Sequence, residues 1–132
     1  MAAKLGGPIT TEARRQRARI AGRRAENWAA LYLRLKGYRI LARGYCVRGG
    51  EIDLIARRGS NIVFVEVKYR PTLIAAMTAI DTWKRQRVSR TARVWLSATP
   101  WAAALTLRGD AVYLAPRQWP RHAIVAFALD FD

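Results

Sequence analysis

Two strand-like segments joined by a tight turn place the strongest constraint on the fold of this chain. Residues 50–56 read GEIDLIA and residues 62–68 read IVFVEVK, and both are rich in the β-branched and aromatic residues that favour strands. The Gly59-Ser60 pair between them is typical of a two-residue hairpin loop, because glycine readily adopts the positive φ that such a turn requires. We therefore predict an antiparallel hairpin over residues 50–68.

The turn also predicts where the charged side chains of the hairpin lie. In the register that it sets, Asp53 is opposite Glu66, and Glu51 is opposite Lys68. Because side chains alternate between the two faces of a strand, these four groups are expected to share one face. The other face is apolar and carries Ile52, Leu54, Val63, Val65 and Val67.

Two carboxylates directly opposite each other repel, at a cost of about 0.2–1 kcal/mol, and a purely structural sheet gains nothing from the pair. A bound Mg²⁺ or Mn²⁺ ion would remove the repulsion, since hard cations are held by carboxylates together with waters and substrate phosphates. Lys68 would then orient a water or stabilise negative charge on a phosphate. The alternative is a Glu51–Lys68 ion pair on a solvated face, with Asp53 and Glu66 simply facing water.

The charge of the chain indicates a polyanionic partner. The 132 residues, 52% of them hydrophobic, suffice for one globular domain but not for two. They include 24 Lys and Arg against 9 Asp and Glu, and the net charge of +15 repels itself unless a polyanion is near. Nucleic acid, with DNA favoured, is the expected partner. An anionic membrane surface is the rival partner, although no apolar run approaches the length of a membrane span, and we expect no membrane association.

The chain has a single cysteine and a single histidine. Because Cys46 is alone, no disulfide can form within the chain, and a reducing cytoplasmic location is expected. Its place in a strand-like run predicts a small buried side chain. One cysteine and one histidine make no zinc constellation, so His122 is expected to be structural.

A basic helix is predicted near the N-terminus. We divide the chain into a flexible basic arm, residues 1–18, and a single domain, residues 19–132. Thr10 or Thr11 is expected to cap a helix that runs to about Leu35. The apolar spacing in this helix predicts a buried stripe of Ala21, Ala25, Trp28, Tyr32 and Leu35. Its arginines are expected to contact phosphates, the alternative being a solvated helix face, and include Arg14, Arg15, Arg17, Arg19 and Arg23.

Glu26 is the only acidic residue between Glu12 and Glu51, and it falls at the boundary between the apolar and the wet side of this helix. The ordinary interpretation is an ion pair with Arg23, which lies one turn away. The functional interpretation is a further carboxylate that leans over the sheet toward a cation. The residues alone leave both open.

The remaining segments predict a mixed sheet with flanking helices. Gly37 is expected to end the first helix, Pro71 the second hairpin strand and Pro100 the second helix. Trp101 and Trp119 lie in loop-like contexts, where burial is the ordinary expectation and stacking on unpaired bases the alternative. The basic face of the second helix is expected to contact phosphates through Lys84, Arg85 and Arg87. The further predicted elements are a strand at 38–47, the helix at 78–98, and strands at 105–115 and 122–128. The order is a helix, a three-stranded meander, a helix and two strands, which defines a single α/β (α+β) domain.

Several short motifs resemble a known protein family. The order of a helix with Glu26, then Asp53, then Glu66-Val67-Lys68 is similar to the PD-(D/E)xK nuclease superfamily, which has the restriction-endonuclease-like fold. More specifically, the chain resembles the YraN family of uncharacterised small bacterial proteins over about residues 20–128. The motifs that carry this resemblance are Ala25-Glu26, GEIDLI at 50–55, FVEVK at 64–68, Lys84 and RHAIVAF at 121–127.

This resemblance implies a metal-dependent phosphodiesterase. Asp53 and Glu66 would bind Mg²⁺ or Mn²⁺ together with the carbonyl of Val67, and Lys68 would position the attacking water or stabilise developing negative charge. Glu26 would correspond to the helix carboxylate of archaeal Holliday-junction resolvases. The similarity to those resolvases suggests branched DNA as a substrate and a homodimer as the assembly.

The sequence features are consistent with three functions. The first is a metal-dependent endonuclease of DNA, in which Glu51 would tune Lys68 from the opposite strand. The second is a non-catalytic DNA- or RNA-binding protein that retains a nuclease fold. The third and weakest is a membrane-surface or protein-interaction module.

Overall fold

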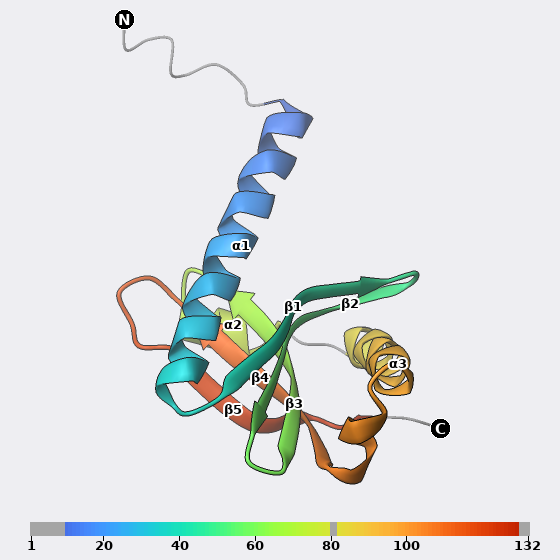
Figure 1. The fold of residues 1–132 in the computed structure, drawn as a ribbon. Coiled ribbons are helices and arrows are strands. Elements are labelled where there is room, and N and C mark those ends of the chain that lie inside the picture. The colour runs from blue at the N-terminus through green and yellow to red at the C-terminus, as the bar shows by residue number, and fades with distance from the viewer. Residues whose placement is uncertain (1–9, 80–81, 130–132) are drawn as a thin grey trace, which may run out of the picture.

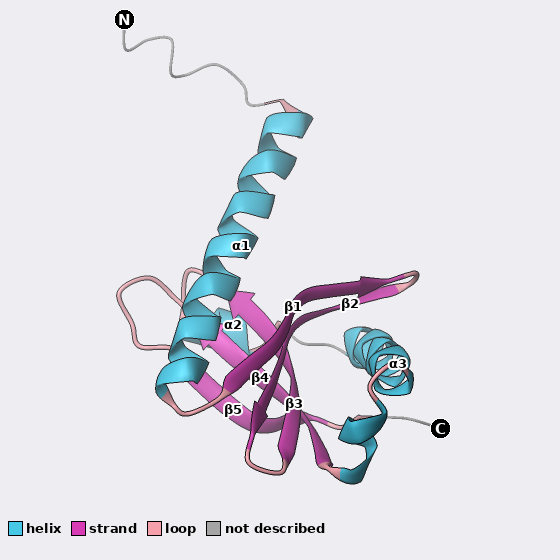
Figure 2. Cartoon of the chain, in the orientation of Figure 1, coloured by secondary structure: helices cyan, strands magenta, loops and turns pink. Residues whose placement is uncertain are grey.

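The described residues form a five-stranded mixed sheet with helices packed against both faces, as Figure 1 shows. The computed structural model describes residues 10–79 and 82–129, without the side chains of 82–84. The strands lie in the order β1-β2-β3-β4-β5, and all neighbours are antiparallel except β3 and β4, which are parallel. The elements are α1 (Thr11–Leu35), β1 (Arg39–Val47), β2 (Gly50–Arg58), β3 (Asn61–Tyr69), α2 (Leu73–Met77), α3 (Thr82–Ser97), η2 (Pro100–Ala104), β4 (Thr106–Leu114) and β5 (Arg121–Phe127). The predicted order and the predicted single α+β domain are confirmed (Figure 2).

The predicted hairpin is formed by β2 and β3. Its turn contains Gly59 at a φ of +61°, and the strands pair from Arg58–Asn61 to Leu54–Val65 in the predicted register. The pairing ends there, one step before Asp53 would face Glu66. From that point β2 turns away together with β1 and passes over α3, while β3 continues beside β4 (Figure 1). We call this separation of β2 residues 50–53 from β3 residues 66–69 the fork.

One glycine, at the start of β2, allows the paired strands β1 and β2 to approach α3. A Cβ atom built on Gly50 would lie 2.2 Å from Thr91 Oγ1 and 2.9 Å from the carbonyl oxygen of Arg87. Only glycine fits this contact, so its backbone packs directly on the helix. The Arg87 side chain secures the same place, because its Nε donates a hydrogen bond of 3.3 Å to the Gly49 carbonyl.

Helix α1 packs on one face of the sheet, mainly with small side chains. Thr10 caps it as predicted, accepting a hydrogen bond from the Ala13 N–H. The buried contacts come from Ala25, Ala29, Ala30 and Leu33, which pack on Leu54, Val63 and Val65. The predicted stripe is therefore wrong for Ala21, Trp28 and Leu35, and Trp28 is 63% exposed. Alanines bring the helix axis close to the sheet, and its bulkiest apolar side chains consequently face outward.

The N-terminal half of α1 extends beyond the sheet (Figure 1). Residues 11–18 of the predicted arm form the first turns of this helix, and residues 1–9 lie outside the described residues. The arm and the domain are thus joined by one continuous helix, which carries the predicted phosphate-contacting arginines away from the core.

The predicted second helix begins at a different residue. A short helix, α2, is capped by Thr72, and α3 starts at Thr82, whereas a single helix over 78–98 was expected. On α3, Val88, Ala92 and Trp95 pack with Phe64 and with Ile52. The expectation that Ile52 joins the face of Leu54 is wrong. The paired strands β1 and β2 twist as they leave β3, and this twist turns the Ile52 side chain toward α3.

His122 belongs to a buried polar network, as predicted for a structural residue. Its Nε2 lies 2.7 Å from Asp110 Oδ2, and its Nδ1 lies 2.6 Å from Lys36 Nζ. An ammonium group only donates, so Nδ1 accepts from Lys36, and the Nε2–H donates to Asp110. Arg108 donates two further hydrogen bonds to Asp110, at 2.9 and 2.8 Å, and one to the Tyr38 hydroxyl. This network ties the end of α1 to β4 and β5.

Three side chains expected to be buried are exposed. Trp101 and Trp119 are 51% and 86% exposed, so the ordinary expectation of burial is wrong for both. Cys46 is also exposed, because it lies on the edge strand β1 where β1 and β2 extend past the core. Its thiol donates a hydrogen bond of 3.0 Å to Glu51 Oε2. Within residues 10–79 and 82–129, no helix has both the length and the apolar character of a membrane span.

Candidate functional site

The side chain of Asp53 bridges the two strands at the fork. Its Oδ2 accepts a hydrogen bond of 2.8 Å from the backbone N–H of Val67 on β3. Where the ladder ends, the carboxylate thus replaces the backbone acceptor that a paired strand would supply. In an extended strand the N–H and carbonyl of one residue point toward the same neighbouring strand, so the Val67 carbonyl also faces the fork.

Three carboxylates gather at this place. Glu26, Glu51 and Asp53 each offer an oxygen, and the three oxygens lie within 4.8 Å of one another. Glu26 reaches the group from α1, whereas the other two come from β2. Glu26 thus reaches from the helix to the two carboxylates of β2. We call Glu26, Glu51 and Asp53 the acidic group.

The surroundings of Glu26 favour its protonated form. Burial raises the pKa of the Glu26 carboxyl, and the carboxylates of Glu51 and Glu66 raise it further. The guanidinium groups of Arg43 and Arg23 oppose this effect and do not cancel it. Arg23 is therefore one of several influences on Glu26, and the neighbouring acids outweigh it.

Glu66 and Lys68 form a buried ion pair on β3. Glu66 Oε2 lies 3.4 Å from Lys68 Nζ, and the two residues are 2% and 8% exposed. Two residues apart on one strand, their side chains share a face, as predicted. The predicted cross-strand pairs do not form as ladder pairs, because the pairing of β2 with β3 stops before Asp53 and Glu51. Glu51 instead joins the acidic group and accepts the hydrogen bond from Cys46.

The arginines predicted to contact phosphates differ in their accessibility. Arg14, Arg15, Arg17, Arg19 and Arg23 are all exposed along α1. On α3, Arg85 is half-buried, and the exposed Arg87 already holds the Gly49 carbonyl. Lys84 lies in α3, and its side chain is outside the described residues. Of the residues predicted to contact phosphates, those on α1 are thus the more accessible.

Arg43 is a residue at this site that sequence reasoning missed. Its guanidinium donates a hydrogen bond to Asn27 Oδ1 and so joins the edge strand β1 to α1, one residue beyond Glu26. It also lowers the pKa of the Glu26 carboxyl. In the β1–β2 pairing Arg43 faces Leu54, the neighbour of Asp53. The register is unbroken from the Val47–Gly50 pair at the turn to Arg43, so extending it from the predicted turn at residues 48–50 would have placed Arg43 opposite Leu54.

The structure defines a class of protein: a small mixed α/β domain that gathers carboxylates where two strands separate and carries arginines on an extended helix. Residues 25–114 match the model of the Uncharacterised protein family UPF0102. The chain belongs to this family, which is the YraN family that its motifs indicate.

Relatives in several bacteria match most of the chain. It is 58% identical over 117 residues to the UPF0102 protein of Methylocella silvestris, covering 89% of this chain and 94% of that protein. It is 60% identical over 119 residues to the UPF0102 protein of Methylobacterium nodulans, covering 89% and 92% of the two. For the UPF0102 protein of Methylorubrum extorquens the identity is 58% over 123 residues, covering 93% and 96%.

Proposed function

We propose that this protein is a metal-dependent endonuclease that hydrolyses phosphodiester bonds in DNA, including branched DNA, in the cytoplasm. The observation that carries the proposal is the acidic group at the fork, flanked on β3 by the Glu66–Lys68 ion pair. Like charges held this close raise the free energy of the folded state. A sheet that served only as scaffold would gain nothing from them, whereas a cation site would. The exposed thiol of Cys46 suits a reducing compartment.

The donor atoms fit Mg²⁺ or Mn²⁺. Every ligand atom of the acidic group is a carboxylate oxygen, the type that hard divalent cations prefer. Asp53 and Glu26 would hold the ion with Glu51, and Glu66 and the Val67 carbonyl are the next candidates on β3. When bound, such an ion neutralises charge on phosphate oxygens and lowers the pKa of a coordinated water.

The residues of the chain would prepare the site around that ion. The Val67 N–H fixes the orientation of the Asp53 carboxylate through the 2.8 Å hydrogen bond. Glu66 holds the Lys68 ammonium at 3.4 Å, where Lys68 would stabilise the negative charge that develops on the phosphate. The exposed residues Arg14, Arg15, Arg17, Arg19 and Arg23 of α1 would bind the backbone of the nucleic acid on either side of the scissile bond.

One observation favours a second candidate, a nucleic-acid-binding protein without catalytic activity. Arg14, Arg15, Arg17 and Arg19 are exposed on the part of α1 that extends beyond the sheet, and phosphate binding by them requires no carboxylate. This function predicts salt-dependent binding that Asp53→Ala leaves unchanged, together with no cleavage under any metal condition.

Cleavage of end-labelled linear and branched DNA in Mg²⁺ or Mn²⁺ tests the proposal. Wild type is expected to cut, and Lys68→Ala to cut at least about a hundredfold more slowly, the loss that follows removal of one charge-stabilising group. Asp53→Asn is expected to be similarly inactive, because it removes a ligand charge and keeps an oxygen for the Val67 N–H.

The matched control is Arg34→Ala, which removes an exposed charge from the last turn of α1 and should cut at the wild-type rate. Circular dichroism would establish that each variant is folded. Equal cutting by wild type and Lys68→Ala would indicate a contaminating nuclease and refute the catalytic assignment.

A further inference from the structure

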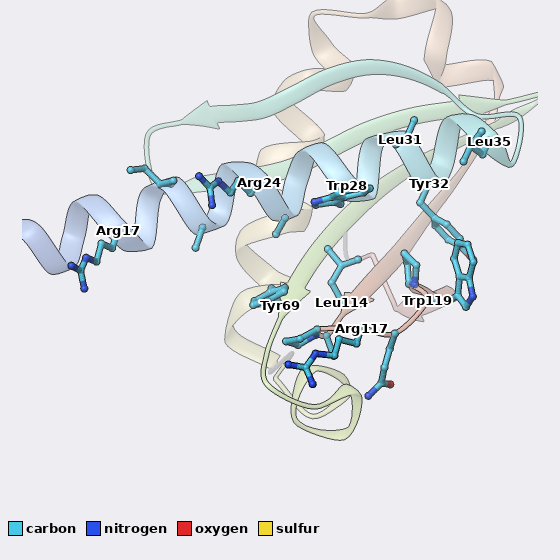
Figure 3. A pocket seen from close by; sticks show the side chains of 17 residues that line it. Arg17, Arg24, Trp28, Leu31, Tyr32, Leu35, Tyr69, Leu114, Arg117 and Trp119 are labelled. Atoms are coloured by element: carbon cyan, nitrogen blue, oxygen red, sulfur yellow. The ribbon is translucent and has the colours of Figure 1, made fainter.

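A large cavity lies between α1, the end of β3 and the segment that connects β4 to β5 (Figure 3). Its volume is about 820 Å³, within the range of roughly 300–1,000 Å³ typical of small-molecule sites. Trp28 from α1, Tyr69 from β3 and Trp119 from the connecting segment line it, and Arg17, Arg24 and Arg117 bring positive charge to it. We call this cavity the aromatic pocket.

The aromatic pocket is distinct from the acidic group. A helix advances about 100° per residue, so Arg17, Arg24 and Trp28 lie on one side of α1, while Glu26 points to the opposite side. The helix separates the two places, and none of the pocket's aromatic or basic residues belongs to the acidic group. The metal-dependent chemistry proposed above leaves the pocket unexplained.

The aromatic side chains are held open to solvent. Trp28 and Trp119 are 63% and 86% exposed, and Tyr69 is exposed beside them. The segment that carries Trp119 is constrained: Pro116 and Pro120 flank it, and Arg117 adopts a left-handed φ of +60°. Large apolar surfaces displayed in this way mark places where a partner binds.

The charge of the lining decides which kind of partner fits. Among the described residues that line the pocket, three are arginines and none is acidic. An apolar protein helix seated here would bury guanidinium groups without a counter-charge, which is costly. A second copy of this chain would bring another net charge of +15. The pocket requires a ligand that covers its aromatic side chains and neutralises its arginines. A ligand with flat apolar faces and regularly spaced negative charges does both.

We propose that the aromatic pocket binds unpaired nucleotides of a nucleic-acid strand. The bases stack on Trp28, Tyr69 and Trp119, and the phosphates pair with Arg17, Arg24 and Arg117. A base inside a duplex has its faces covered by its neighbours, so only a single-stranded segment fits. The choice of DNA as the ligand rests on the proposed function. The inference narrows the substrate class of that function to DNA with an unpaired portion beside the bond that is cut.

The test is binding of a fluorescently labelled single-stranded oligothymidylate and of a duplex of equal length, measured by anisotropy in EDTA so that no cleavage occurs. Trp28→Ala/Trp119→Ala is expected to lose affinity for the single strand by more than about tenfold, since stacking contributes through each base. Duplex affinity should change by less than about threefold, because the α1 arginines remain. Arg24→Glu/Arg117→Glu should weaken single-strand binding in the same way without removing a large side chain.

Trp101→Ala is the matched control, since Trp101 is another exposed tryptophan and lies outside the pocket. It should bind both oligonucleotides like wild type. Unchanged single-strand affinity in both double variants would overturn the proposal, as would an equal loss for single strand and duplex in Trp28→Ala/Trp119→Ala. A wild-type dimer that becomes monomeric in Trp28→Ala/Trp119→Ala would assign the pocket to a second copy and equally overturn it.

The outcome is separable from that of the nuclease proposal. Asp53→Asn leaves the pocket intact and is expected to retain single-strand binding while failing to cut. If wild type binds the single strand through the pocket and never cuts DNA, the nuclease proposal fails and the pocket stands.

Discussion

The Asp53 carboxylate accepts a hydrogen bond of 2.8 Å from the Val67 N–H, across the place where β2 and β3 separate. A side chain from one strand thus completes the backbone hydrogen bonding of the other. The same bond fixes the orientation of an acid that lies within 4.8 Å of two more. The position of Asp53 within the acidic group is therefore built into the sheet.

The bond predicts a difference between two substitutions of Asp53. Asp53→Ala leaves the partly buried Val67 N–H without its acceptor and should lower the free energy of unfolding by about 1–3 kcal/mol. Asp53→Asn keeps a carbonyl oxygen at that place and should stay within about 1 kcal/mol of wild type. Urea unfolding measures both. Equal stability of the two variants would show that the hydrogen bond does not hold the fork.

The ion pair on β3 predicts strong coupling between its members. Lys68→Met leaves the buried Glu66 carboxylate without this counter-charge, at an expected cost of about 3–5 kcal/mol. Adding Glu66→Gln removes the buried charge and should restore at least about 1 kcal/mol of that loss. A double-mutant cycle in urea measures the coupling. Additive effects would mean that the 3.4 Å pair contributes nothing.

The contact of Gly50 with α3 predicts a steric effect. In Gly50→Ala the new methyl group would meet Thr91 and the Arg87 backbone, and the overlap should cost about 1–3 kcal/mol or more. Gly22→Ala is the matched control, because the residue is inside α1 and, apart from its chain neighbours and the backbone of its own helix, no atom lies within 4 Å of a Cβ atom built there. It should stabilise the protein by up to about 1 kcal/mol. Thermal unfolding compares them, and a neutral Gly50→Ala would contradict the packing.

The network around Asp110 predicts a loss of stability in acid. Burial raises the pKa of the Asp110 carboxyl, but hydrogen bonds from His122, Arg108 and the Val125 N–H outweigh it and hold the pKa below its usual range. A carboxyl with a lowered pKa contributes stability above its unfolded pKa of about 3.9, and that contribution is lost as pH falls through the folded value. Lys36 and Tyr38 face the same network through His122 and Arg108.

The free energy of unfolding of wild type and of Asp110→Asn, measured from pH 7 to pH 2, tests this expectation. The advantage of wild type should be constant above about pH 5 and should shrink as the pH falls below about 4. A constant difference over the whole range would show that the carboxylate charge does not stabilise the fold.

The hairpin was predictable because Gly59 and the alternating side chains around it are local signals, and the register from Arg58–Asn61 to Leu54–Val65 follows from them. The fork was not predictable in this way, because the point at which a twisting strand leaves its neighbour depends on α3 packing against Gly50. The buried face of α1 was misassigned at Trp28 because hydrophobicity alone does not distinguish a core contact from an exposed apolar side chain. Pairing along one hairpin also carried no information about Glu26, which reaches the site from another element.

The most direct measurement of the central claim is the location of bound metal by anomalous scattering from crystals soaked in Mn²⁺. The account predicts an anomalous peak at the fork, in direct contact with Asp53 and at least one other member of the acidic group, that disappears in Asp53→Asn. Saturating Mn²⁺ that leaves the fork without a peak in wild type, or that binds only elsewhere on the molecule, would contradict it.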